Sequence, residues 1–180
     1  FLFKMYQAFG HHFDFIAIPI IKKRLRMDTS QVIINEERPQ LTKHLATRFK
    51  EKIGQNVNLL GEVVLGNEEA DHRYHHYLEA LESPDINYIS VKISGIYAQT
   101  HALNYEESFP ELVSRMSALY QKAIDFPYTD EDGIKRSKFI NLDMEEYKDA
   151  HFTLRLFKAV LNLPQFKNYS AGIVVQAYLP

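Results

Sequence analysis

The sequence predicts an α/β domain that is part of a (β/α)8 barrel of the TIM type, with about five parallel strands preceded by one or two helices. Short β-type runs alternate with amphipathic helical segments, which is typical of right-handed βαβ units and a parallel sheet. The second to the fifth run carry polar residues on one face near the carboxyl end. Helices cover both faces of an open sheet, whereas one face of a barrel strand turns inward and forms the active site at its carboxyl end. This pattern favours a barrel.

The amino-terminal segment, residues 1–30, is expected to be helical and separate from the barrel. Apolar residues cluster along it, and interruptions are expected near Gly10 and Pro19. The barrel is expected to span 31–180 and to be truncated after its fifth strand. Its first strand is predicted at 31–34, and the next helix has Pro39 in its first turn.

The remaining units follow in the same order. Further strands are predicted at 56–60, 88–94, 139–145 and 172–178. Helices are predicted at 68–81, 110–126 and 149–161, with Asn67 as the N-cap of the first of these. The segment 127–137 is predicted to be a polar loop.

Composition excludes several kinds of site. The 180 residues are 46% hydrophobic and 24% charged with a net charge of −2, which indicates one soluble globular domain. The only basic run, 22–26, is too small for a nucleic-acid surface. Without cysteine there is no disulfide, thiolate zinc site or cysteine nucleophile. The apolar segment 13–21 is too short to span a bilayer and lacks a signal-peptide arrangement.

Polar residues on the predicted inward faces form a candidate site. Lys92 lies among aliphatic residues, so it either offers a cation to an anionic substrate group or snorkels from an edge strand. The carboxylates of Asp143 and Glu145 share one face and can bind a cationic group, hold an arginine or cap a helix. The amide of Gln176 can both donate and accept, as recognition of a heterocycle requires.

Two other features are expected to carry no site. His72, His75 and His76 form no H-E-x-x-H pattern and lie among charged residues, which indicates a solvated outer helix and no metal site. No glycine-rich phosphate loop is present, so a Rossmann-type nicotinamide site is not supported.

Four segments carry a resemblance to a known family. They are Asn-Leu-Leu-Gly-Glu at 58–62, Ile-Ser-Val-Lys-Ile-Ser at 89–94, Asn-Leu-Asp-Met-Glu-Glu at 141–146 and Val-Gln-Ala-Tyr at 175–178. In this order they resemble the L-G-E, S-x-K-x-S, D-x-E-E and Q-A-Y motifs on the second to fifth strands of the proline dehydrogenase family. This family is a flavin-dependent barrel, found alone or as one domain of bifunctional proline utilisation proteins.

The resemblance implies flavin adenine dinucleotide (FAD) as cofactor and oxidation of L-proline to 1-pyrroline-5-carboxylate, the first step of proline degradation to glutamate. Hydride would pass from the ring carbon beside nitrogen to flavin N5, and electrons would pass to a quinone. By position, Lys92 would bind the proline carboxylate and Glu62 would pair with a substrate-site arginine. Asp143 would be the catalytic acid that orders the substrate-binding arginines. Met144 and Gln176 would contact the flavin.

The chain departs from the family pattern at one position and ends before other family features. Asn58 stands where many members have aspartate. The family's sixth-strand arginine, its R-L-V-K-G-x-Y segment and a late helix with paired arginines would follow Pro180, so we expect this fragment alone to be inactive. The resemblance is compatible with a cytoplasmic protein, with peripheral association at the inner membrane and with a fused aldehyde dehydrogenase domain.

Two other functions stay open at this point. One is a non-catalytic half-barrel that is a remnant or an interaction module, and the other is a barrel enzyme acting on another amino or carboxylic acid. The coding sequence beyond position 180 would distinguish them, since an arginine-bearing strand predicts the enzyme and a stop codon predicts the remnant.

Overall fold

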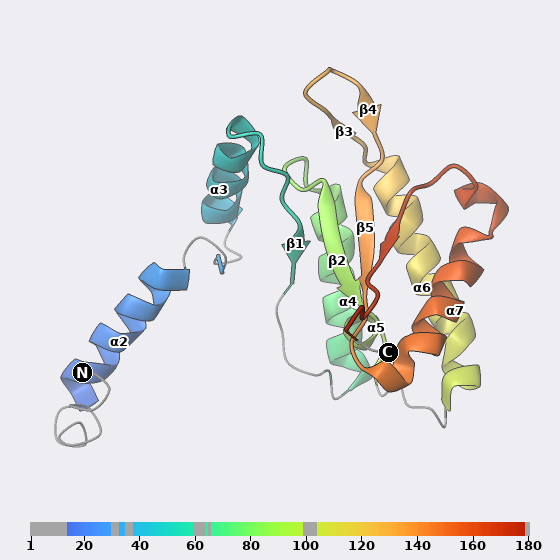
Figure 1. Ribbon diagram of the computed structural model, residues 1–180, viewed down its shortest axis with the longest axis horizontal. Coiled ribbons are helices and arrows are strands. Elements are labelled where there is room, and N and C mark those ends of the chain that lie inside the picture. The colour runs from blue at the N-terminus through green and yellow to red at the C-terminus, as the bar shows by residue number, and fades with distance from the viewer. Residues whose placement is uncertain are drawn as a thin grey trace. The chain divides into compact units, whose positions relative to one another are not determined.

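The computed structural model describes residues 14–29, 33–34, 38–59, 64, 66–98 and 104–178 (Figure 1). Contacts divide the chain into two compact units, Phe1–Thr47 and Arg48–Pro180. The boundary predicted between the amino-terminal segment and the barrel, near residue 30, stays a prediction.

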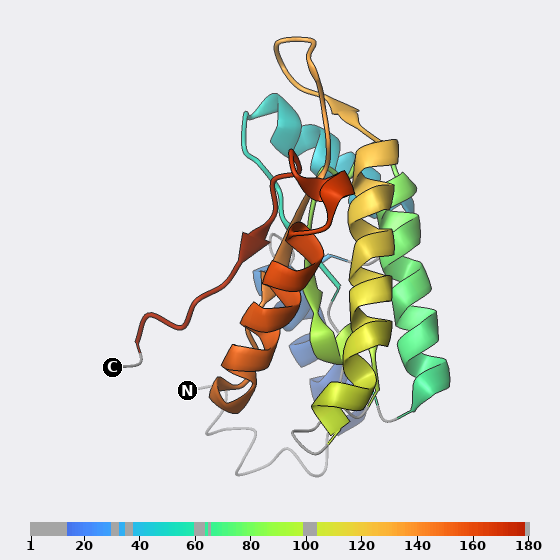
Figure 2. The ribbon, with the colours of Figure 1, turned by 90° about the vertical axis from the view of Figure 1, so that its right-hand side faces the viewer.

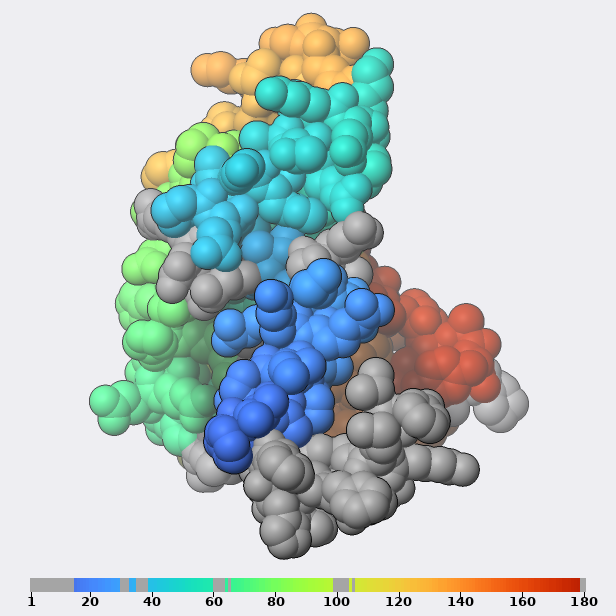
Figure 3. Space-filling model, turned by 90° about the vertical axis from the view of Figure 1, so that its left-hand side faces the viewer, coloured from blue at the N-terminus to red at the C-terminus, as the bar shows by residue number. Residues whose placement is uncertain are grey.

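The first unit contains helix α2 (Asp14–Thr29), which runs through Pro19 without a break, so the interruption predicted there is wrong. A proline in a helix removes one main-chain hydrogen bond. Later contacts support the helix: Arg24 pairs with Asp28 at 3.0 Å, and the Thr29 hydroxyl donates to a main-chain carbonyl one turn earlier. The surface of α2 appears in blue in Figure 3, and apolar side chains such as Phe15 are exposed on it.

The strand predicted at 31–34 is not formed by its described residues, because Ile33 and Ile34 have no strand pairing. Gln31, Val32 and Gly10 lie outside the described residues. Two apolar residues without a paired neighbour have nothing to hold them in a sheet, whatever their β-propensity.

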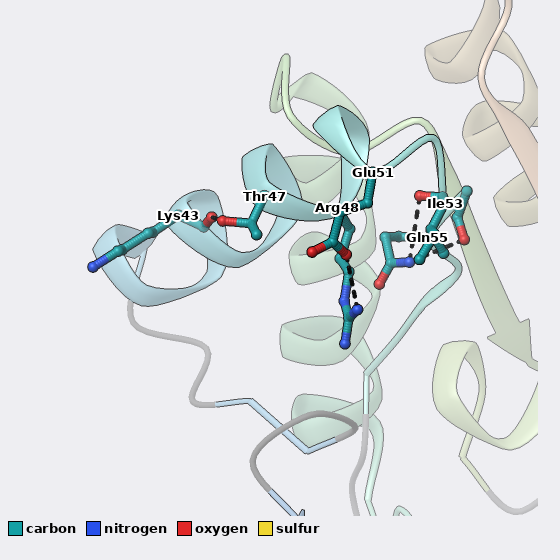
Figure 4. A network of polar contacts seen from close by, with 7 residues as sticks. Lys43, Thr47, Arg48, Glu51, Ile53 and Gln55 are labelled. Carbon is teal, nitrogen blue, oxygen red and sulfur yellow. Dashed lines mark hydrogen bonds and ion pairs between the residues drawn. The ribbon is translucent and has the colours of Figure 1, made fainter.

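Helix α3 (Arg38–Lys50) follows, and polar contacts close its carboxyl end (Figure 4). Arg48 forms an ion pair with Glu51 at 3.0 Å, and the Gln55 amide donates to the Gly54 carbonyl at 3.0 Å. Lys52 has a positive φ of 60°, the left-handed conformation that commonly ends a helix. These contacts end the helix and order the residues that follow it, before the first strand of the sheet.

The second unit is built on a parallel sheet of four strands in the order β1-β2-β5-β6. The strands are β1 (Val57–Asn58), β2 (Tyr88–Lys92), β5 (Phe139–Asp143) and β6 (Gly172–Ile173). They correspond to the second to fifth predicted strands, and each is shorter than predicted. The carboxyl ends of β2 and β5 lie at the lower end of the sheet in Figure 1.

Helices α4 (Asn67–Glu82), α6 (Tyr105–Asp125) and α7 (Ala150–Leu161) cover one face of this sheet and stand in front of the strands in Figure 2. The N-cap of α4 is Gly66, so the prediction of Asn67 as cap is wrong. Helix α6 begins five residues before Pro110, so this proline lies inside the helix and not at its start, and it removes one main-chain hydrogen bond.

The main core lies between the sheet and these helices. Its strand residues alternate along β2 and β5, and its helix residues follow the predicted apolar stripes. The strands contribute Ile89, Val91, Ile140 and Leu142, and the helices contribute Tyr77, Leu81, Leu112, Met116, Leu119, Tyr120, Ala123, Phe152, Leu156 and Val160. Ala70 of α4 is buried in a smaller cluster with Val64 and Ala98. Each fully buried aliphatic side chain contributes roughly 1.5–3 kcal/mol to folding, so this interface stabilises the unit.

The segment predicted as a loop at 127–137 contains an antiparallel pair, β3 (Tyr128–Thr129) and β4 (Lys135–Arg136). Asp130 organises the turn, because its carboxylate accepts the main-chain N–H groups of Asp132 and Ile134 at 3.0 and 2.8 Å and pairs with Arg136. The hydrogen bond from Arg136 lowers the pKa of Asp130. Gly133 supplies the positive φ of 77° that the turn requires.

Three short helices complete the unit: α5 (Ile93–Ile96), η3 (Tyr147–Asp149) and η4 (Pro164–Phe166). Helix α5 replaces the end of the strand predicted at 88–94, so this strand stops at Lys92. Of the helices that the structure describes, none is long and apolar enough to cross a membrane.

Candidate active site

The face of the sheet opposite the helices carries polar side chains at the carboxyl ends of its strands. In the parallel register, Ser90 pairs with Asn141 and Lys92 pairs with Asp143, while Asn58 on β1 pairs with Ser90. Residues paired in register project on the same side of a sheet. The polar rows of β1, β2 and β5 therefore meet, as the period-two pattern predicted.

The carboxylate of Asp143 is held by two asparagine amides. Asn141 donates to Oδ1 at 2.9 Å from the same strand, and Asn58 donates to Oδ2 at 3.4 Å from β1. Both oxygens therefore have a donor, which restricts rotation of the carboxylate. Asn58 makes this contact as an asparagine, because an ionised aspartate has no proton to donate.

Ser90 on β2 and Gly172 on β6 make close contacts with the chain segments that carry Asn58 and Asp143. The Ser90 side chain is buried, and its hydroxyl accepts the amide of Asn56 at 2.9 Å. A Cβ on Gly172 would lie 2.5 Å from Asn141 Oδ1 and 3.0 Å from ring atoms of Phe139. Glycine at this position therefore lets β6 approach the polar side of β5.

Lys92 is the last residue of β2, and its side chain is half-buried beside Asp143 in the register. Its ammonium has no ion pair or hydrogen bond to any described residue. Its main chain is hydrogen bonded to the hydroxyl of Tyr77 on α4, and burial raises the pKa of that tyrosine to about 12. The main chain of Lys92 is thus held from the helix side.

Glu145 connects three strand ends. Its carboxylate accepts the Ser94 hydroxyl at 2.6 Å and the Ser94 main-chain N–H at 3.1 Å, and its carbonyl accepts the amide of Gln176 at 3.4 Å. Gln176 follows β6, so this contact places it beside the segment that contains Met144.

The flavin implied by the resemblance can be tested against these residues. Gln176 Oε1 is buried and has no hydrogen-bond partner among the described residues, although the amide nitrogen of the same side chain is bonded. A buried acceptor without a donor is unfavourable. A ring N–H of a bound heterocycle would supply that donor, so the residue present fits an isoalloxazine.

The structure brings together some of the predicted residues. Lys92 and Asp143 are register partners, and Gln176 lies against the segment after Asp143 that includes Met144. Glu62 lies outside the described residues. Within the described ranges, no group of three or more histidine, aspartate or glutamate side chains has the geometry of a metal site, and the rings of His72 and His76 lie 4.4 Å apart on α4.

Asn141, Ser94 and Tyr77 make contacts in this site for which the sequence predicted no role. Asn141 lies two residues before Asp143 on the same predicted face, so period two places it beside this carboxylate. Ser94 is the last residue of the S-x-K-x-S segment. Tyr77 appeared only in an apolar helix stripe, and nothing in the sequence indicated its contact with Lys92.

Comparison with known proteins gives a family match over most of the chain. The family model of proline dehydrogenase matches residues 41–180. No match was found among curated proteins.

Solved structures of proline utilization A are similar to the chain. The protein from Corynebacterium freiburgense is 39% identical with a TM-score of 0.76, over 87% of this chain and 16% of that one. The protein from Bdellovibrio bacteriovorus, inactivated by N-propargylglycine, is 29% identical with a TM-score of 0.75, over 89% and 18%. A bifunctional proline utilization A protein is 25% identical with a TM-score of 0.58, over 68% and 13%.

The chain thus spans a small part of each of these proteins. The similarity confirms the predicted fold class, a partial (β/α) barrel, and the described strands do not close the barrel. The match of the family model covers most of the sequence and includes every strand of the described sheet. The chain belongs to the proline dehydrogenase family.

Proposed function

We propose that the full-length protein containing this chain oxidises L-proline to 1-pyrroline-5-carboxylate. Family membership supports this proposal. The observation that carries it is that Lys92 and Asp143 are register partners on the polar face of the sheet. A zwitterionic amino acid needs a cation for its carboxylate and a polar surface that orients its amino nitrogen, which in proline is part of the ring. Other amino acids share that requirement, so the substrate itself has to be tested.

The cofactor we propose is FAD. The unpartnered acceptor of Gln176 supports it, and Met144 would add an apolar contact to the ring system. When bound, the flavin supplies at N5 an acceptor for the hydride that leaves the proline ring carbon beside nitrogen, and its electrons pass to a quinone.

Lys92 binds the proline carboxylate in this proposal. Its ammonium has no partner among the described residues, so a carboxylate would complete an ion pair without displacing one of them. Asp143 orients the cationic groups that surround the substrate, and the two asparagine amides hold its carboxylate for that purpose. Glu62 would pair with a substrate-site arginine.

Further proposals concern the whole protein. Similarity to bifunctional proline utilization A is compatible with an aldehyde dehydrogenase domain in the same polypeptide. The family resemblance is compatible with a cytoplasmic location and with peripheral association at the inner membrane. We expect a domain boundary near residue 30, with the barrel domain beginning there. We also expect the 180 residues to be inactive alone, because the polar face of the described sheet is not enclosed as it is in a closed barrel.

The test is to express the full-length protein and to measure flavin absorbance and proline-dependent reduction of an artificial electron acceptor. The proposal requires both. The isosteric Asp143→Asn variant should keep the flavin and lose roughly tenfold or more of kcat/KM, because the group that orients the substrate site is changed.

Absence of flavin and of proline turnover in the unaltered protein would overturn the proposal and favour a non-catalytic half-barrel. Turnover of another amino or carboxylic acid, with none of proline, would identify a different barrel enzyme. Exposed Asp132, in the turn between β3 and β4, provides a matched control as Asp132→Asn.

A further inference from the structure

Helix α5, the single turn that follows Lys92, is held from the helix side of the sheet. Arg115 on α6 donates to the carbonyl of Ile96 at 2.9 Å. Tyr77 on α4 lies against Gly95, where an added Cβ would be only 3.1 Å from its hydroxyl. The turn is therefore packed against two helices, and a larger residue at Gly95 would require the Tyr77 side chain to move.

The opposite side of the turn is held by Glu145 alone among the described contacts. Ser94 directs both its main-chain N–H and its hydroxyl at the two oxygens of Glu145, at 3.1 and 2.6 Å. Hydrogen bonds to an ionised acceptor are about twice as strong as those between neutral groups. This pair connects the carboxyl end of β2 to that of β5.

The main chain of Glu145 makes the third connection. Its carbonyl accepts the amide of Gln176, which follows β6. Glu145 thus lies between the ends of three strands that carry Lys92, Met144 and Gln176. Lys92 is two positions before Ser94, and Met144 directly precedes Glu145. Gln176 contacts Glu145 directly.

The neighbouring Glu146 shows that this arrangement is not a general property of the acidic segment. Glu146 pairs with Lys148 at 2.9 Å, and both side chains are mostly exposed, at 66% and 61%. An exposed pair between near neighbours contributes little to stability. The two adjacent glutamates therefore differ in what they connect: Glu146 pairs locally, whereas Glu145 joins separate strands.

We propose that Glu145 is a positioning residue, which holds the α5 turn through Ser94 and so fixes the spacing of Lys92, Met144 and Gln176. Its effect on catalysis rests on the proposed function. Its effect on the structure does not, because the Ser94–Glu145 contact exists without substrate or cofactor.

The experiment uses the full-length protein with Glu145→Ala, Ser94→Ala, their combination, and Glu145→Gln. Thermal unfolding of flavin-free protein provides the first measurement, as a double-mutant cycle. We expect the combined variant to be no less stable than Glu145→Ala alone, because Glu145→Ala already removes the contact that the Ser94 hydroxyl makes. Additive losses of stability would overturn the proposal.

Flavin content per polypeptide, kcat and KM for proline provide the second measurement. Glu145→Ala should lower flavin content and raise KM by about tenfold, because small displacements of binding groups have large effects. Ser94→Ala should have a smaller effect, since the main-chain N–H remains. Glu145→Gln should recover part of the loss, because its amide oxygen still accepts from Ser94.

Glu146→Ala is the matched control, and it should match the unaltered protein in flavin content and KM. If Glu145→Ala behaves like Glu146→Ala in all measurements, the proposal is wrong. If the unaltered protein has neither flavin nor proline turnover, the proposed function fails, and the unfolding cycle still decides whether Glu145 and Ser94 are coupled.

Discussion

Lys92 and Asp143 occupy the same register position on the adjacent parallel strands β2 and β5. A cationic and an anionic side chain therefore leave the same face of the sheet next to each other, although no direct ion pair joins them in the described residues. Asp143 is hydrogen bonded to asparagine amides instead, so the Lys92 ammonium keeps its capacity for another anion.

Lys92→Ala is expected to raise the KM for proline with a smaller change in kcat. A hydrogen bond to a charged group contributes roughly 1.5–3 kcal/mol, which corresponds to a change in KM of about ten- to a hundredfold. Steady-state kinetics of the full-length protein measures both constants. Lys135→Ala, on exposed β4, is the control and should leave them unchanged. A fall in kcat at constant KM would contradict a role in substrate binding.

Gly172→Ala is expected to destabilise the sheet. The new Cβ would meet Asn141 Oδ1 at 2.5 Å and the Phe139 ring at 3.0 Å, so both side chains must move. Overpacking of this kind lowers the free energy of unfolding by about 1–3 kcal/mol, measurable by thermal unfolding.

Gly54→Ala is the control for this substitution, because nothing lies within 4 Å of its added Cβ. It should be neutral or stabilise by up to about 1 kcal/mol. Equal stability of the two variants would show that the close approach of β6 to β5 is absent in solution.

Two neighbouring tyrosines should differ in how loss of the hydroxyl changes stability. The rings of Tyr120 and Tyr169 lie 4.9 Å apart. The Tyr120 hydroxyl is buried without a hydrogen-bond partner in the described residues, whereas that of Tyr169 donates to the Lys138 carbonyl at 3.0 Å. Burial raises the pKa of Tyr120, so its hydroxyl remains neutral at ordinary pH.

Tyr120→Phe should therefore raise the free energy of unfolding or leave it unchanged, and Tyr169→Phe should lower it by about 1 kcal/mol. Thermal unfolding of both variants under the same conditions makes the comparison. A loss of stability on Tyr120→Phe as large as that on Tyr169→Phe would indicate a partner for the Tyr120 hydroxyl.

The buried ammonium of Lys138 should make stability depend on pH. Its side chain is 1% exposed and donates to the Ser83 carbonyl. Burial lowers its pKa from 10.5 to about 8, and the nearby Asp85 partly opposes this. Between about pH 8 and 10.5 the unfolded chain binds more protons than the folded protein, so this group makes stability rise with pH in that window.

Lys138→Met removes this dependence. Relative to the unaltered protein, its free energy of unfolding should be highest near neutral pH and should fall by roughly 2–3 kcal/mol as the pH rises through the window. Denaturant unfolding at several pH values measures the difference. Exposed Lys167→Met is the control, and parallel pH curves for Lys138→Met and the unaltered protein would contradict the prediction.

The local sequence pattern predicted the buried residues correctly where one face of an element is apolar. The alternation in β2 and β5 predicted that Val91 and Leu142 would be buried, and the helix stripes predicted Tyr77 and Leu156 in the core. An apolar side chain is driven into the core whichever element it packs against. The spacing of apolar residues along the sequence therefore distinguishes a strand, with a period of two, from a helix, with a period of about 3.6.

Local pattern failed where distant contacts oppose the local preference. Ile93 and Ser94 read as the end of a strand, yet Arg115, Tyr77 and Glu145 hold them in a helical turn. The hairpin β3–β4 depends on the Asp130 carboxylate, which an alternation pattern does not register. In both cases polar contacts between residues apart in the sequence decide the backbone conformation, and local propensity does not.

The sequence by itself determined which residues lie on the polar face, because side chains alternate along a strand whatever its neighbours are. It also determined the family, through motifs that lie in order along the chain. Only the tertiary structure decided the register that places Lys92 beside Asp143, the two amides that hold this carboxylate, and the position of Glu145 between three strands. Register depends on long-range pairing and packing, which no local pattern contains.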